Sequence, residues 1–90
     1  MADVKKKASA GTLESSDVYV ELAPDEKSLE LSIESVVSRQ FGESIRETVL
    51  DVLKQQNVEM AVVRIIDRGA LECVIRARVE TAVLRAREGN

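Results

Sequence analysis

The chain has 90 residues, of which 44% are apolar and 32% are charged, and its formal net charge is −3. This size and composition are typical of one small globular domain with a modest core. The absence of histidine and the single cysteine, Cys73, exclude a serine–histidine–aspartate triad, an internal disulfide and a CxxC zinc site, while the negative charge and only two aromatic residues argue against a nucleic-acid partner.

Residues 1–16 are small, polar and basic, and they show no helical or strand periodicity. We expect a flexible N-terminal arm here, followed by a single folded domain over residues 17–90. No apolar core follows the basic run, so the arm does not resemble a secretory signal, and no apolar stretch approaches the roughly 20 residues that span a bilayer. We therefore expect a cytoplasmic protein without a membrane partner.

Two segments then alternate apolar and polar residues with the period of a β-strand. They are DVYVELA, with Val18, Val20 and Leu22 on one face, and SLELSIES. The short polar link between them begins with Pro24, which breaks the first strand. This pattern predicts an antiparallel hairpin.

The period becomes helical in the next segment, which we expect to end near Gln56. Its start is open, because Ser38 is as good a first residue as the capping box that Ser44 and Glu47 offer. The apolar stripe consists of Phe41, Ile45, Val49, Val52 and Leu53.

The segment EMAVVRIID is rich in β-branched residues, which predicts a third strand. Ala61, Val63 and Ile65 would face the core, and Val62 and Ile66 would lie on the opposite face. That face is more apolar than a solvated one should be. We favour a central strand with extra cover as the explanation over a surface for a partner subunit.

The last segment, ALECVIRARVETAVLRARE, contains strong helix formers and no glycine or proline, which predicts a second helix. The predicted fold is α+β, a two-layer sandwich of order β-β-α-β-α with a three-stranded mixed sheet covered by two helices, in which residues 28–67 permit a parallel crossover. The expected buried arc of this helix is Leu71, Val74, Ile75, Val79, Ala82 and Ala86.

Most reactive side chains have a structural explanation. Cys73 has no histidine to activate it, so we interpret it as a small, semi-buried apolar residue. Four carboxylates along the strands lack metal-ligand spacing, and we assign them to the solvated side of the sheet. They are Asp17, Glu21, Glu30 and Glu34.

The second helix is basic, with Arg76, Arg78, Arg85 and Arg87. Arg78 and Arg85 lie at the edge of the apolar arc, so we expect their stems to pack and their charged ends to reach water. The alternative is an anion site or an acidic partner. Charge is also uneven along the chain. Residues 1–60 carry seven basic and twelve acidic residues, a balance of −5, and residues 61–90 carry six and four, a balance of +2, which suits docking between subunits.

Two neighbouring serines lie in the stretch AGTLESSD at residues 10–17. Ser15 cannot act as a catalytic nucleophile, because no histidine is present to take its proton. It can still be the target of a modifying enzyme. Ser28 precedes a leucine, as the attachment serine of helical acyl carrier proteins does, but Lys27 stands where those proteins have aspartate. The alternation of residues 18–34 also argues against their four-helix fold.

The stretch AGTLESSD closely resembles the N-terminal motif of the citrate lyase acyl carrier proteins, the gamma subunits of bacterial citrate lyase. Two further blocks resemble the same family: QFGESIRETVLDVLKQQNV, and DRGALECVIRARVETAVLRA with its GAL start and RAR triplet. The resemblance covers the chain from Ala10 to Ala86. The sequence departs from the family pattern at its basic tip and at Ser16, where glycine is at least as expected.

The resemblance implies a covalently attached 2'-(5''-phosphoribosyl)-3'-dephospho-CoA group, joined by a phosphodiester to the serine of the GTLES block. By residue match this is Ser15, with Ser16 as the alternative. The thiol of the group would hold an acetyl residue as a thioester. The transferase (alpha) subunit would exchange acetyl for citryl, and the lyase (beta) subunit would cleave citryl to oxaloacetate. A prosthetic-group transferase would load the chain, which would itself be a non-catalytic carrier.

Two other functions remain open. A malonate decarboxylase carrier subunit uses the same kind of cofactor, although the AGTLESSD and DRGALECVIRAR blocks favour citrate lyase. The chain could instead be a non-covalent adaptor that docks subunits through Val62, Ile66 and the arginine helix. Replacing Ser15 with alanine separates these classes, because it would abolish carrier function and leave an adaptor unharmed.

Overall fold

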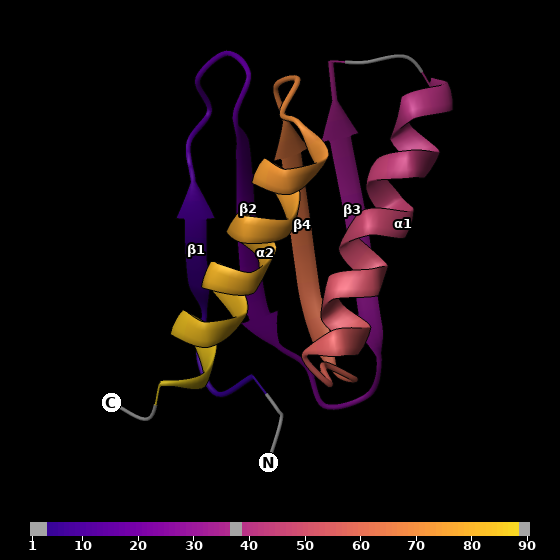
Figure 1. The fold of residues 1–90 in the computed structure, drawn as a ribbon. Helices are drawn as coiled ribbons and strands as arrows, with labels where there is room; N and C mark the ends of the chain where they lie inside the picture. The colour runs from indigo at the N-terminus through magenta and orange to yellow at the C-terminus, as the bar shows by residue number, and fades with distance from the viewer. Residues whose placement is uncertain (1–3, 37–38, 89–90) are drawn as a thin grey trace.

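The computed structural model describes residues 4–36 and 39–88, with the backbone alone described for residues 39–41. Its element order is β-β-β-α-β-α (Figure 1). The elements are β1 (Ala8–Gly11), β2 (Val18–Pro24), β3 (Leu29–Ser35), α1 (Arg39–Gln55), β4 (Ala61–Asp67) and α2 (Glu72–Arg87).

The four strands form one mixed sheet in the order β1-β2-β4-β3. β4 lies antiparallel to β2 and parallel to β3, with Val63 opposite both Leu22 and Leu31. The predicted hairpin between β2 and β3 is therefore wrong, because β4 separates the two strands. The parallel pairing of β3 and β4 across α1 is the crossover that the sequence permits. β4 takes one of the two interior positions, beside β2, which suits a strand with apolar residues on both faces.

The prediction of three strands is wrong because residues 8–11 form a fourth, β1. β1 pairs antiparallel with β2, with Ala8 opposite Leu22 and Gly11 opposite Tyr19. The segment ASAG gives no alternating pattern, since its small side chains carry little hydrophobic signal. Its place depends instead on pairing with β2 and on packing against α2, which buries Ala10. The predicted arm of residues 1–16 thus contains a strand, and the mobility of residues 12–16 stays a prediction.

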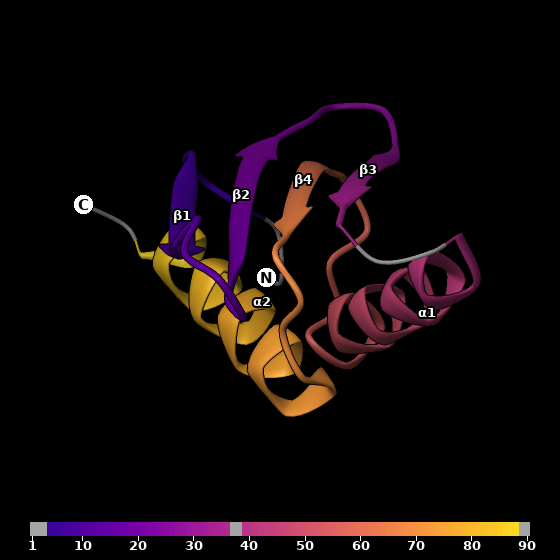
Figure 2. The ribbon, with the colours of Figure 1, turned by 90° about the horizontal axis from the view of Figure 1, so that it is seen from above.

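Both helices cover the same face of the sheet, which gives the expected two-layer arrangement (Figure 2). The core faces of the two inner strands are fully buried, as the alternation predicts. The buried arc of α2 differs from the prediction at two residues. Leu71, at the N-cap, is 72% exposed, and Val83, which was not predicted, is buried. The buried residues of the two inner strands are Val18, Val20, Leu22, Ala61, Val63 and Ile65, and those of α2 are Ile75, Val79, Ala82, Val83 and Ala86.

The two ends of α1 have different outcomes. Ser44 and Glu47 lie inside the helix, so the capping box that they offered is not its start, while Ser38 lies outside the described residues. The C-terminus ends near the predicted place in a Schellman motif. Val58 N–H donates to Leu53 O over 2.9 Å, and Asn57 N–H donates to Lys54 O over 3.0 Å, with Asn57 at φ 58°. Asparagine tolerates this left-handed conformation better than most residues.

The other face of the sheet carries no helix (Figure 2). On it Ile66 lies opposite Tyr19 on β2 and Glu34 on β3, and only 8% of Ile66 is exposed. Val62 remains 39% exposed. The favoured explanation of a covered central strand therefore describes Ile66 and only partly describes Val62.

Candidate functional site

Ser15 and Ser16 lie in the loop of residues 12–17 that joins β1 to β2, and both are exposed. This loop stands at the end of the sheet where β4 leads into α2 (Figure 1). Ser28 lies in the β2–β3 connection at the opposite end and precedes a strand. The fold thus separates the candidate serines onto two ends of the molecule.

Side-chain hydrogen bonds close the loop beneath the serines. Thr12 Oγ1 donates to Asp17 Oδ2 over 2.6 Å and accepts from Glu14 N–H over 3.2 Å. The Asp17 N–H also donates to Glu14 O over 3.2 Å. Threonine and aspartate commonly stabilise turns in this way, by bonding to nearby backbone groups. The arrangement leaves the Ser15 side chain without a hydrogen bond to any described part of the chain.

A salt bridge fixes the loop to α2. Arg78 donates from Nε to Asp17 Oδ1 over 3.2 Å and from Nη2 to Asp17 Oδ2 over 3.0 Å. The Asp17 side chain is 15% exposed, and its Oδ1 also accepts from Val18 N–H over 2.7 Å. The hydrogen bonds from Thr12 and from the Val18 N–H, together with Arg78, lower the pKa of Asp17 from 3.8 to about 2. Asp17 therefore stabilises the loop. The prediction that it belongs to the solvated side of the sheet is wrong.

Glycine is required where β1 enters this loop. Gly11 has φ +91°, and a Cβ there would lie 1.8 Å from Val18 O and 3.3 Å from Arg78 Cδ. Ser16 also has a positive φ of 65°, in the left-handed region that favours glycine. This explains why glycine is an equally natural residue at position 16.

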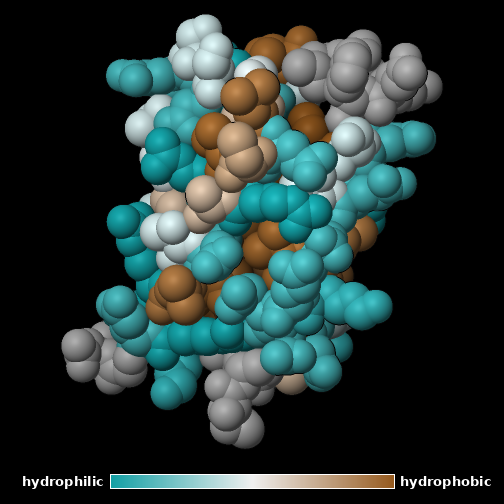
Figure 3. All heavy atoms as spheres, in the orientation of Figure 1, coloured by the Kyte–Doolittle hydropathy of each residue, from teal (hydrophilic) through white to brown (hydrophobic). Residues whose placement is uncertain are grey.

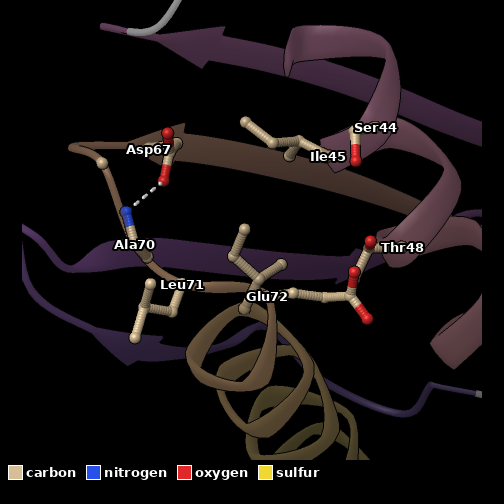
Figure 4. A pocket seen from close by; sticks show the side chains of 9 residues that line it. Ser44, Ile45, Thr48, Asp67, Ala70, Leu71 and Glu72 are labelled. Atoms are coloured by element: carbon tan, nitrogen blue, oxygen red, sulfur yellow. Dashed lines mark hydrogen bonds between the residues drawn. The ribbon is translucent and has the colours of Figure 1, made fainter.

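The loop is also tied to the β4–α2 connection. Ser16 N–H donates to Arg68 O over 2.8 Å, and Arg68 N–H donates to Asp17 O over 2.9 Å. Asp67, only 1% exposed, anchors the connection from below. Its carboxylate accepts from Ala70 N–H over 3.0 Å, as Figure 4 shows. It also accepts from Ser35 Oγ–H over 2.8 Å.

A cavity of about 310 Å³ opens between the start of α1 and this connection. Figure 4 shows the side chains around it, with Ser44, Ile45 and Thr48 on the α1 side. Neither of the candidate serines of the loop is among its lining residues, which also include Asp67, Gly69, Ala70, Leu71, Glu72 and Ile75.

Apolar side chains are exposed at the end of the molecule that carries the serine loop. Leu13 in the loop is 52% exposed, Leu71 at the N-cap of α2 is 72% exposed, and Val36 after β3 is 64% exposed. Figure 3 shows apolar atoms at the upper end of this view, over the start of α2.

The four arginines of α2 bind inside the chain, which argues against an open anion site on that helix. Arg76 pairs with Asp51 at 2.9 Å and with Glu72 at 3.3 Å, and Arg78 pairs with Asp17. The other two bind backbone or amide oxygens: Arg85 Nη1 donates to Ser9 O over 2.9 Å, and Arg87 donates to both oxygens of Gln56.

Two further expectations concern reactive groups. Cys73 is exposed rather than semi-buried, because it lies on the outer side of the first turn of α2. Within the described residues there is no group of three or more histidine, cysteine, aspartate or glutamate side chains that could hold a metal ion. The described helices are also too short or too polar to cross a membrane.

Comparison with known proteins places the chain in a class. A family model described as "ACP: Malonate decarboxylase delta subunit (MdcD)" matches residues 5–86. A chain in the crystal structure of a Pseudomonas malonate decarboxylase hetero-tetramer in complex with malonate has the same fold, with a TM-score of 0.78 and 22% identity over 91% of this chain and 84% of that one. These matches define an acyl carrier protein.

Relatives with higher identity narrow the class. The citrate lyase acyl carrier protein of Serratia proteamaculans (strain 568) is 55% identical over 82 residues, which cover 90% of this chain and 80% of that protein. The one of Edwardsiella ictaluri (strain 93-146) is 54% identical over 81 residues, covering 88% and 82%. This chain belongs to the family of citrate lyase acyl carrier proteins, which the resemblance of its sequence blocks had indicated.

Proposed function

We propose that the chain serves as the carrier subunit of a citrate lyase and that Ser15 is the residue to which its prosthetic group is attached. The observation that supports an attachment in this loop is the exposed Ser15 hydroxyl, which lies in a loop held by Thr12, Asp17 and Arg78. The match to the GTLES block favours Ser15 over Ser16, whose side chain is also exposed. A modifying enzyme needs a reachable hydroxyl in a defined backbone setting. Thr12, Asp17 and Arg78 provide that setting, and they leave Ser15 itself unbound.

The group that suits this site is 2'-(5''-phosphoribosyl)-3'-dephospho-CoA, linked through a phosphodiester. A primary hydroxyl at the surface is the protein atom that such a link requires. When bound, the group supplies a thiol on which an acyl residue is held as a thioester. The chain has no histidine to serve as a general base for Ser15, so we assign deprotonation of the hydroxyl to the prosthetic-group transferase and regard this subunit as non-catalytic.

The partners that we propose are the transferase (alpha) and lyase (beta) subunits of citrate lyase. Leu13 in the loop, and Leu71 and Val36 at the same end of the molecule, are exposed and offer apolar contacts to an enzyme that approaches Ser15. A short tether raises the effective concentration of the acyl group at a docked active site to the order of millimolar. We assign the complex to the cytoplasm.

Intact mass and peptide mapping test the attachment. The chain is produced together with its maturation enzymes as the wild type, as Ser15→Ala and as Ser16→Ala. We expect the wild type and Ser16→Ala to gain the mass of the group on the peptide that contains Ser15, and Ser15→Ala to gain none. An unmodified wild-type mass, or a group mapped to Ser16 or Ser28, would overturn the assignment.

Activity of the assembled complex separates the remaining functions. A citrate lyase carrier supports acyl exchange with citrate lyase subunits, whereas a malonate decarboxylase carrier supports exchange with malonate decarboxylase subunits. A non-covalent adaptor would support assembly equally well as Ser15→Ala. The family model named for malonate decarboxylase is the reason to include that enzyme in the comparison.

A further inference from the structure

Arg68 is held beside the Ser15 loop by its backbone. Its N–H donates to Asp17 O over 2.9 Å, and its carbonyl accepts from Ser16 N–H over 2.8 Å. These two bonds lie just beyond the end of the antiparallel ladder, where Val18 lies opposite Asp67, and they form a bulge in which residues 16 and 17 both bond to Arg68. Ser15 directly precedes Ser16, so its Cα atom lies about 3.8 Å from that of a residue bonded to Arg68.

The side chain of Arg68 does not contribute a polar contact to the described part of the fold. It is exposed, and it forms neither an ion pair nor a hydrogen bond with the described part of the chain. This sets it apart from the four arginines of α2, which all bind internal partners. An exposed guanidinium without a partner among the described residues thus lies next to the loop.

The charges of the loop explain what such a cation could bind. Asp17 is neutralised by Arg78, whereas Glu14 is exposed. A phosphodiester on Ser15 would add a second negative charge next to Glu14 and would be destabilised by that neighbour. Arginine suits a phosphate particularly well, because its planar fork of N–H groups matches two phosphate oxygens.

We propose that the Arg68 guanidinium binds the phosphate that is attached to Ser15 and so fixes the direction in which the prosthetic group leaves the loop. This inference rests on the proposed function. Arg68 acts here as a binding and positioning residue. Its contribution to the loop itself comes from the backbone, so replacing the side chain preserves both hydrogen bonds to residues 16 and 17.

The test uses loaded, full-length chain and its NMR spectra. The phosphorus signals of the attached group are compared in the wild type, Arg68→Gln, Arg68→Lys and Arg64→Gln. Arg64 is the matched control, because it is an exposed arginine of β4, the strand that ends just before Arg68, and lies four residues from the loop contact. The arginine Nε–H signals are recorded in loaded wild type and in Ser15→Ala.

We expect the phosphodiester phosphorus signal to shift in Arg68→Gln, to shift less in Arg68→Lys and to stay unchanged in Arg64→Gln. The Arg68 Nε–H signal should move and exchange more slowly in loaded protein than in Ser15→Ala. Loaded protein whose phosphorus and Arg68 signals do not respond would overturn the inference and leave the proposed function standing. A wild-type chain that gains no mass on maturation would overturn both.

Discussion

Arg78 on α2 and Asp17, the last residue of the loop before β2, are 61 residues apart in sequence and form a bidentate salt bridge at 3.0 and 3.2 Å. The pair joins two of the three sequence blocks that resemble the citrate lyase carriers, the AGTLESSD block and the block with the RAR triplet. Both blocks therefore contribute to the same site. The block with the RAR triplet supplies Arg78, and Arg78 holds the serine loop of the AGTLESSD block in place. Four properties follow from this arrangement and its surroundings.

Asp17 should make stability depend on pH. Its pKa is about 2 in the folded chain and 3.8 as the ordinary value, so the stabilisation is present above pH 3.8 and is lost as the pH falls towards 2. Asp17→Asn should lower the free energy of unfolding at pH 7 by about 1–2 kcal/mol, allowing for partial solvent screening. Urea unfolding at pH 7, 4 and 2 measures this.

Glu14→Gln removes the same charge from the same loop without breaking an ion pair and is the control. We expect it to change the free energy of unfolding by less than about 0.5 kcal/mol. A wild-type advantage over Asp17→Asn that stays constant from pH 7 to pH 2 would contradict the role given to the carboxylate.

Gly11 and Gly42 should respond in opposite directions to alanine. At Gly11 the new Cβ meets Val18 O and the backbone has a positive φ, so Gly11→Ala should lower the free energy of unfolding by more than about 2 kcal/mol. At Gly42, within α1, no atom lies within 4 Å of the new Cβ, so Gly42→Ala should raise it by up to about 1 kcal/mol. Thermal and urea unfolding of both variants check this, and equal effects would refute the close approach at Gly11.

Ser16→Gly should stabilise the chain and leave loading intact. Its φ of 65° costs a residue with a side chain more than it costs glycine, and part of this gain is offset by the greater flexibility of glycine when unfolded. The expected gain is about 0.5–1 kcal/mol. Ser32→Gly, on β3, should instead destabilise. Loss of the mass increase in Ser16→Gly would mean that Ser16 takes part in attachment.

Asp67 should be required for the connection that carries Arg68. Asp67→Ala leaves the Ala70 N–H without its acceptor in a partly buried position, which costs about 1–3 kcal/mol. Amide hydrogen exchange should speed up in residues 68–72 more than in β2. Glu34→Ala, an exposed residue of β3, is the control, and exchange that speeds up equally across the whole sheet would argue for general unfolding instead.

The sequence predicts best the elements whose burial has a strong period. The core faces of β2 and β4 agree with the alternation, and α1 buries Ile45, Val49, Val52 and Leu53 of the predicted stripe, since side chains with one buried face must repeat with the backbone. The arc of α2 agrees only in part, because Leu71 is exposed and Val83 is buried. β1 could not be found in this way, because alanine, serine and glycine carry too little apolar surface. The place of β4 between β2 and β3 also escaped prediction, since strand order depends on contacts distant in sequence.

The residues of the candidate site were also predictable from the sequence only in part. Ser15 came from its resemblance to a family motif, and composition alone gave it little weight. Asp17 looked like one of several solvated carboxylates, because alternation does not reveal that β2 begins only after it and that α2 delivers Arg78 to the same point. Position 16 is the one place where a departure from the motif marked a structural property, the positive φ.

The hairpin of β1 and β2 changes how an acyl group on Ser15 would travel. A serine on a loose arm could swing while its domain stayed docked. Because the loop of residues 12–17 is tied to β4 and α2, we expect the polypeptide to add little reach of its own. The length of the attached group would then limit how far apart two active sites can lie. To reach a more distant site, the whole carrier domain would have to rotate or move between the two enzymes.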